Sequence, residues 1–138
     1  MSNEQHEKFS QLNEIQRLQF ELLRHTRYNL LDGERVVNDL LEWRELWYSA
    51  IAGRLPMFPE KKGAFHIELV LLRTTRWEQW PVDMLYIWTN DEHIETLRQR
   101  IKARWDVSEI GEYTPDEEEM YWATMRDPHD RVLWVWWD

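Results

Sequence analysis

Two residues in one segment have a spacing that suits acid–base or metal chemistry. His66 and Glu68 lie two positions apart in AFHIELVLLR, and side chains two apart on a β-strand project from the same face. Such a pair can give two ligands to a metal ion, or place a carboxylate beside a histidine that acts as a base. A metal needs further ligands, and no spacing ties another histidine to this pair. His66 and Glu68 are therefore weak catalytic candidates, and we expect no metal site and no cofactor.

The segment RTTRWEQWP, residues 73–81, is the leading candidate for a binding site. Arg and Trp are enriched among the residues that dominate binding at protein interfaces, and the segment contains Arg73, Arg76, Trp77 and Trp80. It belongs to residues 54–81, where five Lys or Arg outnumber three Asp or Glu. Such a loop could hold an acidic partner or stack on a planar ligand through cation–π contacts. The alternative is that both tryptophans close one end of the core.

Other signatures of catalysis or ion binding are missing from the sequence. It contains no phosphate-binding Gly-rich loop, no G-x-S-x-G or H-E-x-x-H motif and no zinc-ligand spacing. The acidic run at 116–119 lacks the spaced ligands and the glycine of a calcium loop, so we interpret it as a solvated face. The sequence leaves enzymatic activity uncertain and favours a non-enzymatic function.

Composition restricts the class of protein further. The chain has 138 residues, a net charge of −9, ten Trp and no Cys. A net negative charge argues against nucleic acid as a partner, because affinity for it comes largely from Lys and Arg that neutralise phosphates. No segment has the length and apolar character of a membrane-spanning helix or a secretory signal. We therefore expect a cytoplasmic protein that does not bind membranes.

Two helices are predicted in the first 53 residues. Residues 3–28 have apolar side chains at three- and four-residue spacing, namely Phe9, Leu12, Ile15, Leu18, Leu22 and Leu23. Asp32 is the predicted N-cap of a second helix over 33–52, and Gly53 is its predicted C-terminal cap. A short turn between the helices indicates an antiparallel helical hairpin.

The rest of the chain predicts mainly strands. Alternating or β-branched segments indicate strands at 64–72, 82–89 and 131–137, and the stripe Ile94, Leu97, Ile101 and Trp105 indicates a helix over 92–105. Residues 115–125 allow either a helix that begins after Thr114 or a strand in a hairpin, and we favour the hairpin. In the last strand Val132, Trp134 and Trp136 face one way, and Leu133, Val135 and Trp137 face the other.

These elements predict one α+β domain over residues 1–138. Residues 1–53 form the helical hairpin, and residues 64–138 form a β-β-α-(β)-β-β portion. The hairpin packs on a mostly antiparallel sheet of four to five strands, with one additional helix. Because the last strand is apolar on both sides, both sheet faces should be covered. Helix 92–105 or a second protein chain would cover the face opposite the hairpin.

The C-terminal part contains a motif known from one enzyme family. Arg126, Asp127 and Pro128 precede an alternating apolar strand, and the stretch 84–138 resembles the βαβββ half-module of the glyoxalase (vicinal oxygen chelate) superfamily. The resemblance implies a metal ligand on the final strand, where that family commonly has Glu. The corresponding residue here is Trp134, which cannot ligate a metal.

Together these observations predict a small interaction or regulatory module that binds a protein partner, possibly a second copy of itself. The homodimer hypothesis comes from the surplus of Trp and from the strands that are apolar on both faces. The alternative is a small-molecule-binding or metal-assisted enzyme domain, distantly glyoxalase-like, with a pocket between the sheet and the helical hairpin. Four tryptophans would line that pocket, namely Trp43, Trp47, Trp88 and Trp134.

Overall fold

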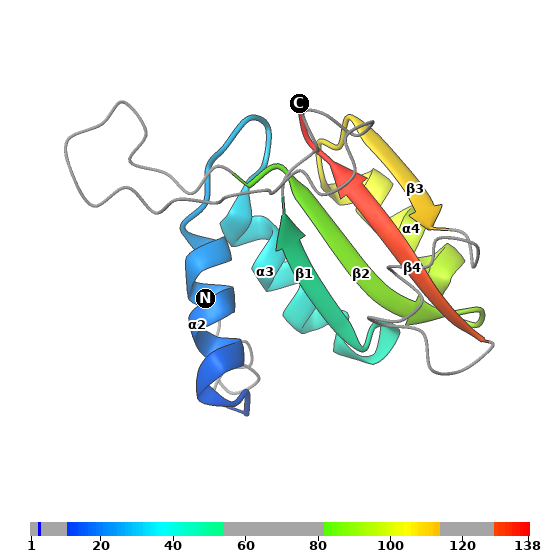
Figure 1. Cartoon of the computed structure of the whole chain (residues 1–138), viewed down its shortest axis with the longest axis horizontal. Coiled ribbons are helices and arrows are strands. Elements are labelled where there is room, and N and C mark those ends of the chain that lie inside the picture. The colour runs from blue at the N-terminus through cyan, green and yellow to red at the C-terminus, as the bar shows by residue number, and fades with distance from the viewer. Residues whose placement is uncertain (1–2, 4–10, 54–81, 114–128) are drawn as a thin grey trace, which may run out of the picture.

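The computed structural model describes residue 3 and residues 11–53, 82–113 and 129–138. In chain order the elements are α2 (Glu14–Arg24), α3 (Gly33–Glu42), the 3-10 turn η1 (Arg44–Leu46), β1 (Ser49–Gly53), β2 (Met84–Asn90), α4 (Ile94–Arg104), β3 (Glu109–Tyr113) and β4 (Asp130–Trp136). The predicted α+β class is confirmed, since a helical hairpin and one further helix pack with an antiparallel sheet (Figure 1).

The four described strands follow the order β1-β2-β4-β3, and every neighbouring pair is antiparallel. β2 and β4 occupy the middle, with Ile87 opposite Leu133 near their centre. β1 and β3 are the edges of this sheet. Residues on the four strands therefore fall into two sets, one on each face.

One face of the sheet forms the core together with α3 and α4. Leu85 and Ile87 on β2 and Leu133 and Val135 on β4 are fully buried there. Both helices lie behind the sheet in Figure 1, and the ring of Trp43 stacks on that of Trp105 at 5.6 Å. The predicted helix 92–105 thus lies on the same face as α3, so that no described helix covers the opposite face.

The final strand has the two-sided pattern that the sequence predicts. Leu133, Val135 and Trp137 point into the core and are buried. On the other side Val132 is buried, whereas Trp134 and Trp136 are half-buried. The aromatic side chains of this strand and of Trp137 therefore lie in two separate environments, the core and the opposite face of the sheet.

The helical hairpin depends on a close backbone approach. The N–H of Gly33 donates to the carbonyl of Thr26 at 2.9 Å, and a Cβ at Gly33 would overlap the carbonyl oxygen of Leu23. Asp32 caps α3 as predicted, because its side chain accepts from the N–H of Arg35. Only glycine lets the start of α3 come this near to the end of α2.

The predicted helix over 33–52 is wrong beyond Glu42. Trp47 is buried and donates from Nε1 to the carbonyl of Leu40 at 2.8 Å, which satisfies one of the free carbonyls at the end of α3. Residues 49–53 then form β1, paired with β2. Gly53 is consequently not a helix cap. Strand pairing gives these residues hydrogen bonds, and aromatic and β-branched residues such as Tyr48 and Ile51 favour extended backbone.

The first helix also differs from its prediction. α2 begins at Glu14, where Asn13 and Gln16 form a reciprocal capping box, so the helix does not continue through residues 11–13. The apolar residues of the predicted stripe are not all buried: Leu23 is buried, but Ile15 and Leu18 are 69% and 64% exposed. Asn13 with Gln16 is a cap signal that the sequence contained and that our prediction overlooked.

α3 and α4 are joined by a buried charge. Asp39 is 2% exposed, and its two carboxylate oxygens accept from Nε and Nη2 of Arg104, each at 3.0 Å. Nε1 of Trp105 donates to the same carboxylate at 2.9 Å. The carboxylate is therefore fully paired, and it ties α3 to the end of α4.

The predicted strand 64–72 and the region 115–125 lie outside the described residues. The strand Glu109–Tyr113 is the optional strand of the predicted order, and β1 was not predicted at all. The described elements share one core cluster. The assignment of residues 1–138 to a single domain stays a prediction.

Candidate functional site

The residues that the sequence singled out for chemistry fall in one segment. His66, Glu68, Arg73, Arg76, Trp77 and Trp80 all lie within residues 54–81, outside the described part of the structure. Their roles stay predictions. The Arg126, Asp127 and Pro128 motif of the glyoxalase resemblance lies outside it as well.

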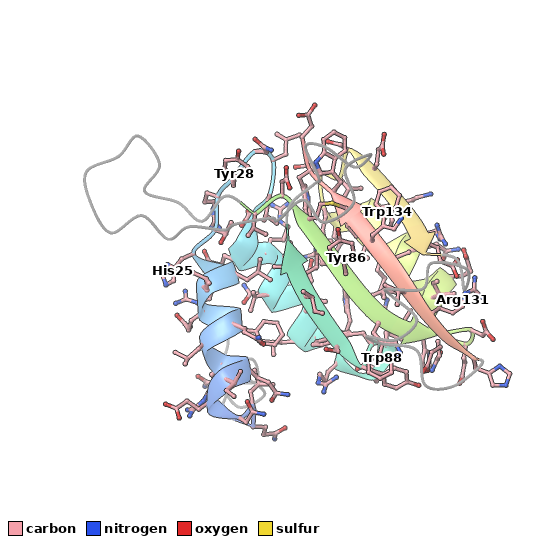
Figure 2. The ribbon with its side chains drawn as sticks, in the orientation of Figure 1. His25, Tyr28, Tyr86, Trp88, Arg131 and Trp134 are labelled. Atoms are coloured by element: carbon pink, nitrogen blue, oxygen red, sulfur yellow. The ribbon has the colours of Figure 1, made fainter. Side chains whose placement is uncertain are left out.

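The structure separates the four tryptophans predicted to line one pocket. Trp43 and Trp47 are buried on the core side, whereas Trp88 and Trp134 project from the opposite face of the sheet (Figure 2). A single pocket cannot therefore be lined by all four. Of these residues, only Trp47 contributes to the groove described next.

An open groove of about 360 Å³ lies between α2 and β1. Figure 1 shows α2 running beside this edge of the sheet. Residues of α2, Phe20 among them, and of β1 line it, together with Trp47 and Leu85. Its volume lies within the range of about 300–1,000 Å³ that is usual for ligand sites. The groove thus occupies the place between hairpin and sheet where the alternative hypothesis put a pocket.

Two packed aromatic rings form part of the lining of the groove. The rings of Phe20 and Trp47 meet edge to face at 6.1 Å, and Nε1 of Trp47 is fixed by the carbonyl of Leu40. The guanidinium of Arg44 lies 4.5 Å from the centre of the Trp47 ring and donates from Nη1 to the Trp47 carbonyl at 2.8 Å. Arg44 is therefore held at the groove by two contacts with one residue.

Several large apolar side chains on the elements that border the groove are exposed, and three of them, Leu22, Tyr48 and Ile51, also line it. Large side chains on α2 and at β1 are exposed, namely Ile15, Leu18, Leu22, Tyr48 and Ile51. We call these five residues the α2–β1 patch. Scattered apolar residues are normal on a surface, but a cluster beside a groove is typical of an interaction site.

The face of the sheet opposite the helices is aromatic. Trp134 lies over Gly111 of β3, where a Cβ would overlap its ring, and a Cβ at Gly53 would lie 3.2 Å from Cε2 of Tyr86. Glycines on the two edge strands thus make room for rings that lie along the sheet. Trp88 meets Tyr48 edge to face at 5.6 Å, and its buried Nε1 has no hydrogen-bond partner among the described residues.

A charged network holds one end of the sheet. Arg131 on β4 donates to Glu112 on β3 and, from Nη1, to Asp91 at 2.6 Å. Nδ1 of His129 lies 3.0 Å from the same aspartate. These hydrogen bonds, from Arg131 first and then His129, lower the pKa of Asp91 below its usual range. The network joins β3, β4 and the turn after β2, and its exposed His–Asp pair lacks the enclosed setting that tunes a catalytic base.

Within the described ranges, no group of three or more His, Cys, Asp or Glu side chains is placed to hold a metal ion. No helix among those residues is both long and apolar enough to cross a membrane. Trp134, which the glyoxalase resemblance puts at the position of a metal ligand, packs on Gly111.

No protein-family model matches the chain, and comparisons with curated proteins and with solved structures find no significant match.

Sequence reasoning missed the groove and Arg44. Arg44 lay inside a predicted helix, where nothing distinguished it from other surface charges. One signal was present in α2: its apolar residues cover more of the helix girth than contact with α3 alone can bury.

Proposed function

We propose that the protein works by binding another protein, as a small interaction or regulatory module without catalytic activity. The observation that carries this proposal is the groove between α2 and β1 together with the exposed α2–β1 patch around it. Desolvation of such a surface by a partner gains free energy in proportion to the apolar area covered.

The α2–β1 patch can be tested without damaging the fold. Leu18 and Ile51 are 64% and 55% exposed, so the double variant Leu18→Asp/Ile51→Asp should change the stability by no more than about 1 kcal/mol. We expect proteins captured from cells by the wild type to be lost with this variant. Glu95→Ala, on exposed α4 surface and outside the lining of the groove, is the control. Equal capture by all three proteins would contradict the proposal.

A homodimer is the second part of the proposal. It is supported by the aromatic face, where Trp88, Trp134 and Trp136 remain half-buried on the side of the sheet that the described helices do not cover. Sedimentation velocity over a wide concentration range should show a dimer. A monomer at every concentration would exclude it.

Small-molecule binding is the alternative function, and the volume of the groove and its mainly apolar lining favour it. Native mass spectrometry of the purified protein, without added metal or ligand, distinguishes the two. A clean apo dimer supports the interaction module. Extra bound mass on a monomer supports the alternative, and His66→Ala and Glu68→Ala would then be the first variants to test.

The loop 73–81 and the cytoplasmic location belong to the same proposal. We expect the double variant Arg76→Ala/Trp77→Ala to weaken partner binding, because these residue types dominate many interfaces. Unchanged affinity would remove the loop from the binding surface. The absence of Cys suits a reducing compartment, and cell fractionation checks that location.

A further inference from the structure

The groove borders the backbone of a strand edge that pairs with no other described strand. Four successive residues of β1, Ser49 to Ala52, line it. Successive side chains of a strand point to opposite faces of the sheet, so a groove that touches all four must lie along the strand edge. β1 is the edge of the described sheet on this side.

The residues of β1 itself include none of those that commonly guard an edge strand against pairing. Edge strands are commonly guarded by charged residues, by proline or by bulges, whereas β1 reads SAIAG and has neither a charge nor a proline. Its side chains are also small, except Ile51, so an added strand could approach closely. Extended peptides bind to such edges by continuing the hydrogen-bond ladder, and alternate side chains then enter pockets on either side.

The wall opposite β1 suits the side chains of such a peptide. Phe20, Leu22 and Leu23 on α2, with Leu12 just before it, contribute apolar surface, and Gln16 and Gln19 contribute amide groups. The groove therefore offers backbone hydrogen bonds on one side and apolar contacts on the other. A strand added to β1 would therefore lie between β1 and α2.

Arg44 is the only charged residue among the described residues that line the groove. It is held over Trp47 and uses Nη1 for the Trp47 carbonyl. A guanidinium has five N–H donors, and no ion pair joins Arg44 to a described carboxylate. A carboxylate on the ligand would complement this charge and would accept its remaining hydrogen bonds.

From these observations we infer that the groove binds an extended segment of a partner protein that adds a strand to β1. The segment has apolar residues at alternate positions and one Asp or Glu that pairs with Arg44. This inference rests on the proposed function, because it names the partner chemistry of the same surface.

A displayed library of random seven-residue peptides, selected on the whole wild-type protein, tests the inference. We expect enriched peptides to alternate apolar residues and to share one acidic position. Binding of a synthetic enriched peptide should fall at least tenfold when that acid is changed to its amide, and also when backbone N-methylation removes the N–H groups that a ladder requires.

Variants of the protein make the test specific to Arg44. Arg44→Glu should lose the acidic peptides by at least tenfold and should select peptides with Lys or Arg at the same position. Arg17→Glu is the matched control, since it reverses a charge on exposed α2 surface outside the groove. Because Arg44 also contacts Trp47, Arg44→Gln with a check of thermal unfolding separates lost recognition from lost folding.

Four other outcomes are possible. Each would contradict the inference, and each can be distinguished from the rest. Enriched apolar peptides without an acid, or with equal affinity for Arg44→Glu, overturn the inference and leave the proposed function standing. Tight binding of decanoate in competition with the peptides would assign the groove to small molecules. A dimer that Leu18→Asp dissociates would assign it to a second copy. No enrichment over an unrelated protein would overturn both the inference and the proposed function.

Discussion

Arg104 shows how one exposed side chain protects a buried one. Its side chain is 56% exposed, but its guanidinium makes two hydrogen bonds to Asp39, whose side chain is 2% exposed. Removing the arginine would leave a carboxylate in the core with only the indole N–H of Trp105 as a partner. An unpaired buried charge is among the most costly defects in a protein.

We therefore expect Arg104→Ala to lower the free energy of unfolding by about 3 kcal/mol, the lower end of the range for breaking a buried ion pair. Urea unfolding measures this loss. Lys102→Ala, on the exposed side of the same helix, should change stability by less than about 0.5 kcal/mol. Equal losses in both variants would show that Asp39 does not depend on Arg104.

Gly53 and Gly111, which lie on the two edge strands, differ in the space that each leaves for an added Cβ. A Cβ at Gly111 would overlap the Trp134 ring, but one at Gly53 would approach a Tyr86 ring carbon only to 3.2 Å. We expect Gly111→Ala to destabilise the fold by about 1–3 kcal/mol, as overpacking does, and Gly53→Ala to cost less. Urea midpoints compare the two. Adding Trp134→Leu should recover part of the Gly111→Ala loss, and no recovery would contradict the proposed clash.

At the scale of elements, the hairpin is set by the contact between the end of α2 and the start of α3. We expect Gly33→Ala to destabilise the protein by about 3 kcal/mol or more, because its Cβ would overlap backbone atoms that cannot rotate away. Glu34→Ala, one residue later and exposed, is the control and should cost about 1 kcal/mol or less. Thermal unfolding by circular dichroism distinguishes the two variants. A mild effect of Gly33→Ala would mean that the helices can separate.

Elements with a strong local pattern could be predicted, and those that depend on distant pairing could not. The helix at 94–104 and the strand at 130–136 carry their apolar pattern within their own residues, as Leu97 and Val135 illustrate. β1 does not, because its extended backbone comes from pairing with β2, which starts more than thirty residues later. The groove depends on β1, so its position could not be predicted either.

At the scale of the whole molecule, charge links segments that are remote in sequence. The pKa of Asp91 is lowered first by its hydrogen bond from Arg131 and then by that from His129. A lowered pKa in the folded state contributes stability above the ordinary carboxylate range, and this contribution is lost as the pH falls through the folded pKa.

We expect the stability difference between the wild type and Asp91→Asn to be largest at pH 5 and above, and to shrink below about pH 4, near the ordinary pKa of aspartate. Urea midpoints of both proteins at several pH values test this. Glu92→Gln, which changes the neighbouring exposed carboxylate, should show no comparable pH dependence. A constant difference down to the acid transition would contradict the assigned role of Asp91.

The order β1-β2-β4-β3 also has a consequence for how fast the chain can fold. The central pair joins Ile87 to Leu133 across more than forty residues, and Nδ2 of Asn29 donates to the carbonyl of Trp137, 108 positions away. Loops of that length must close before the central ladder gains its hydrogen bonds. The protein should therefore refold in milliseconds to seconds rather than microseconds, and during that interval β2 and β4 both present unpaired edges.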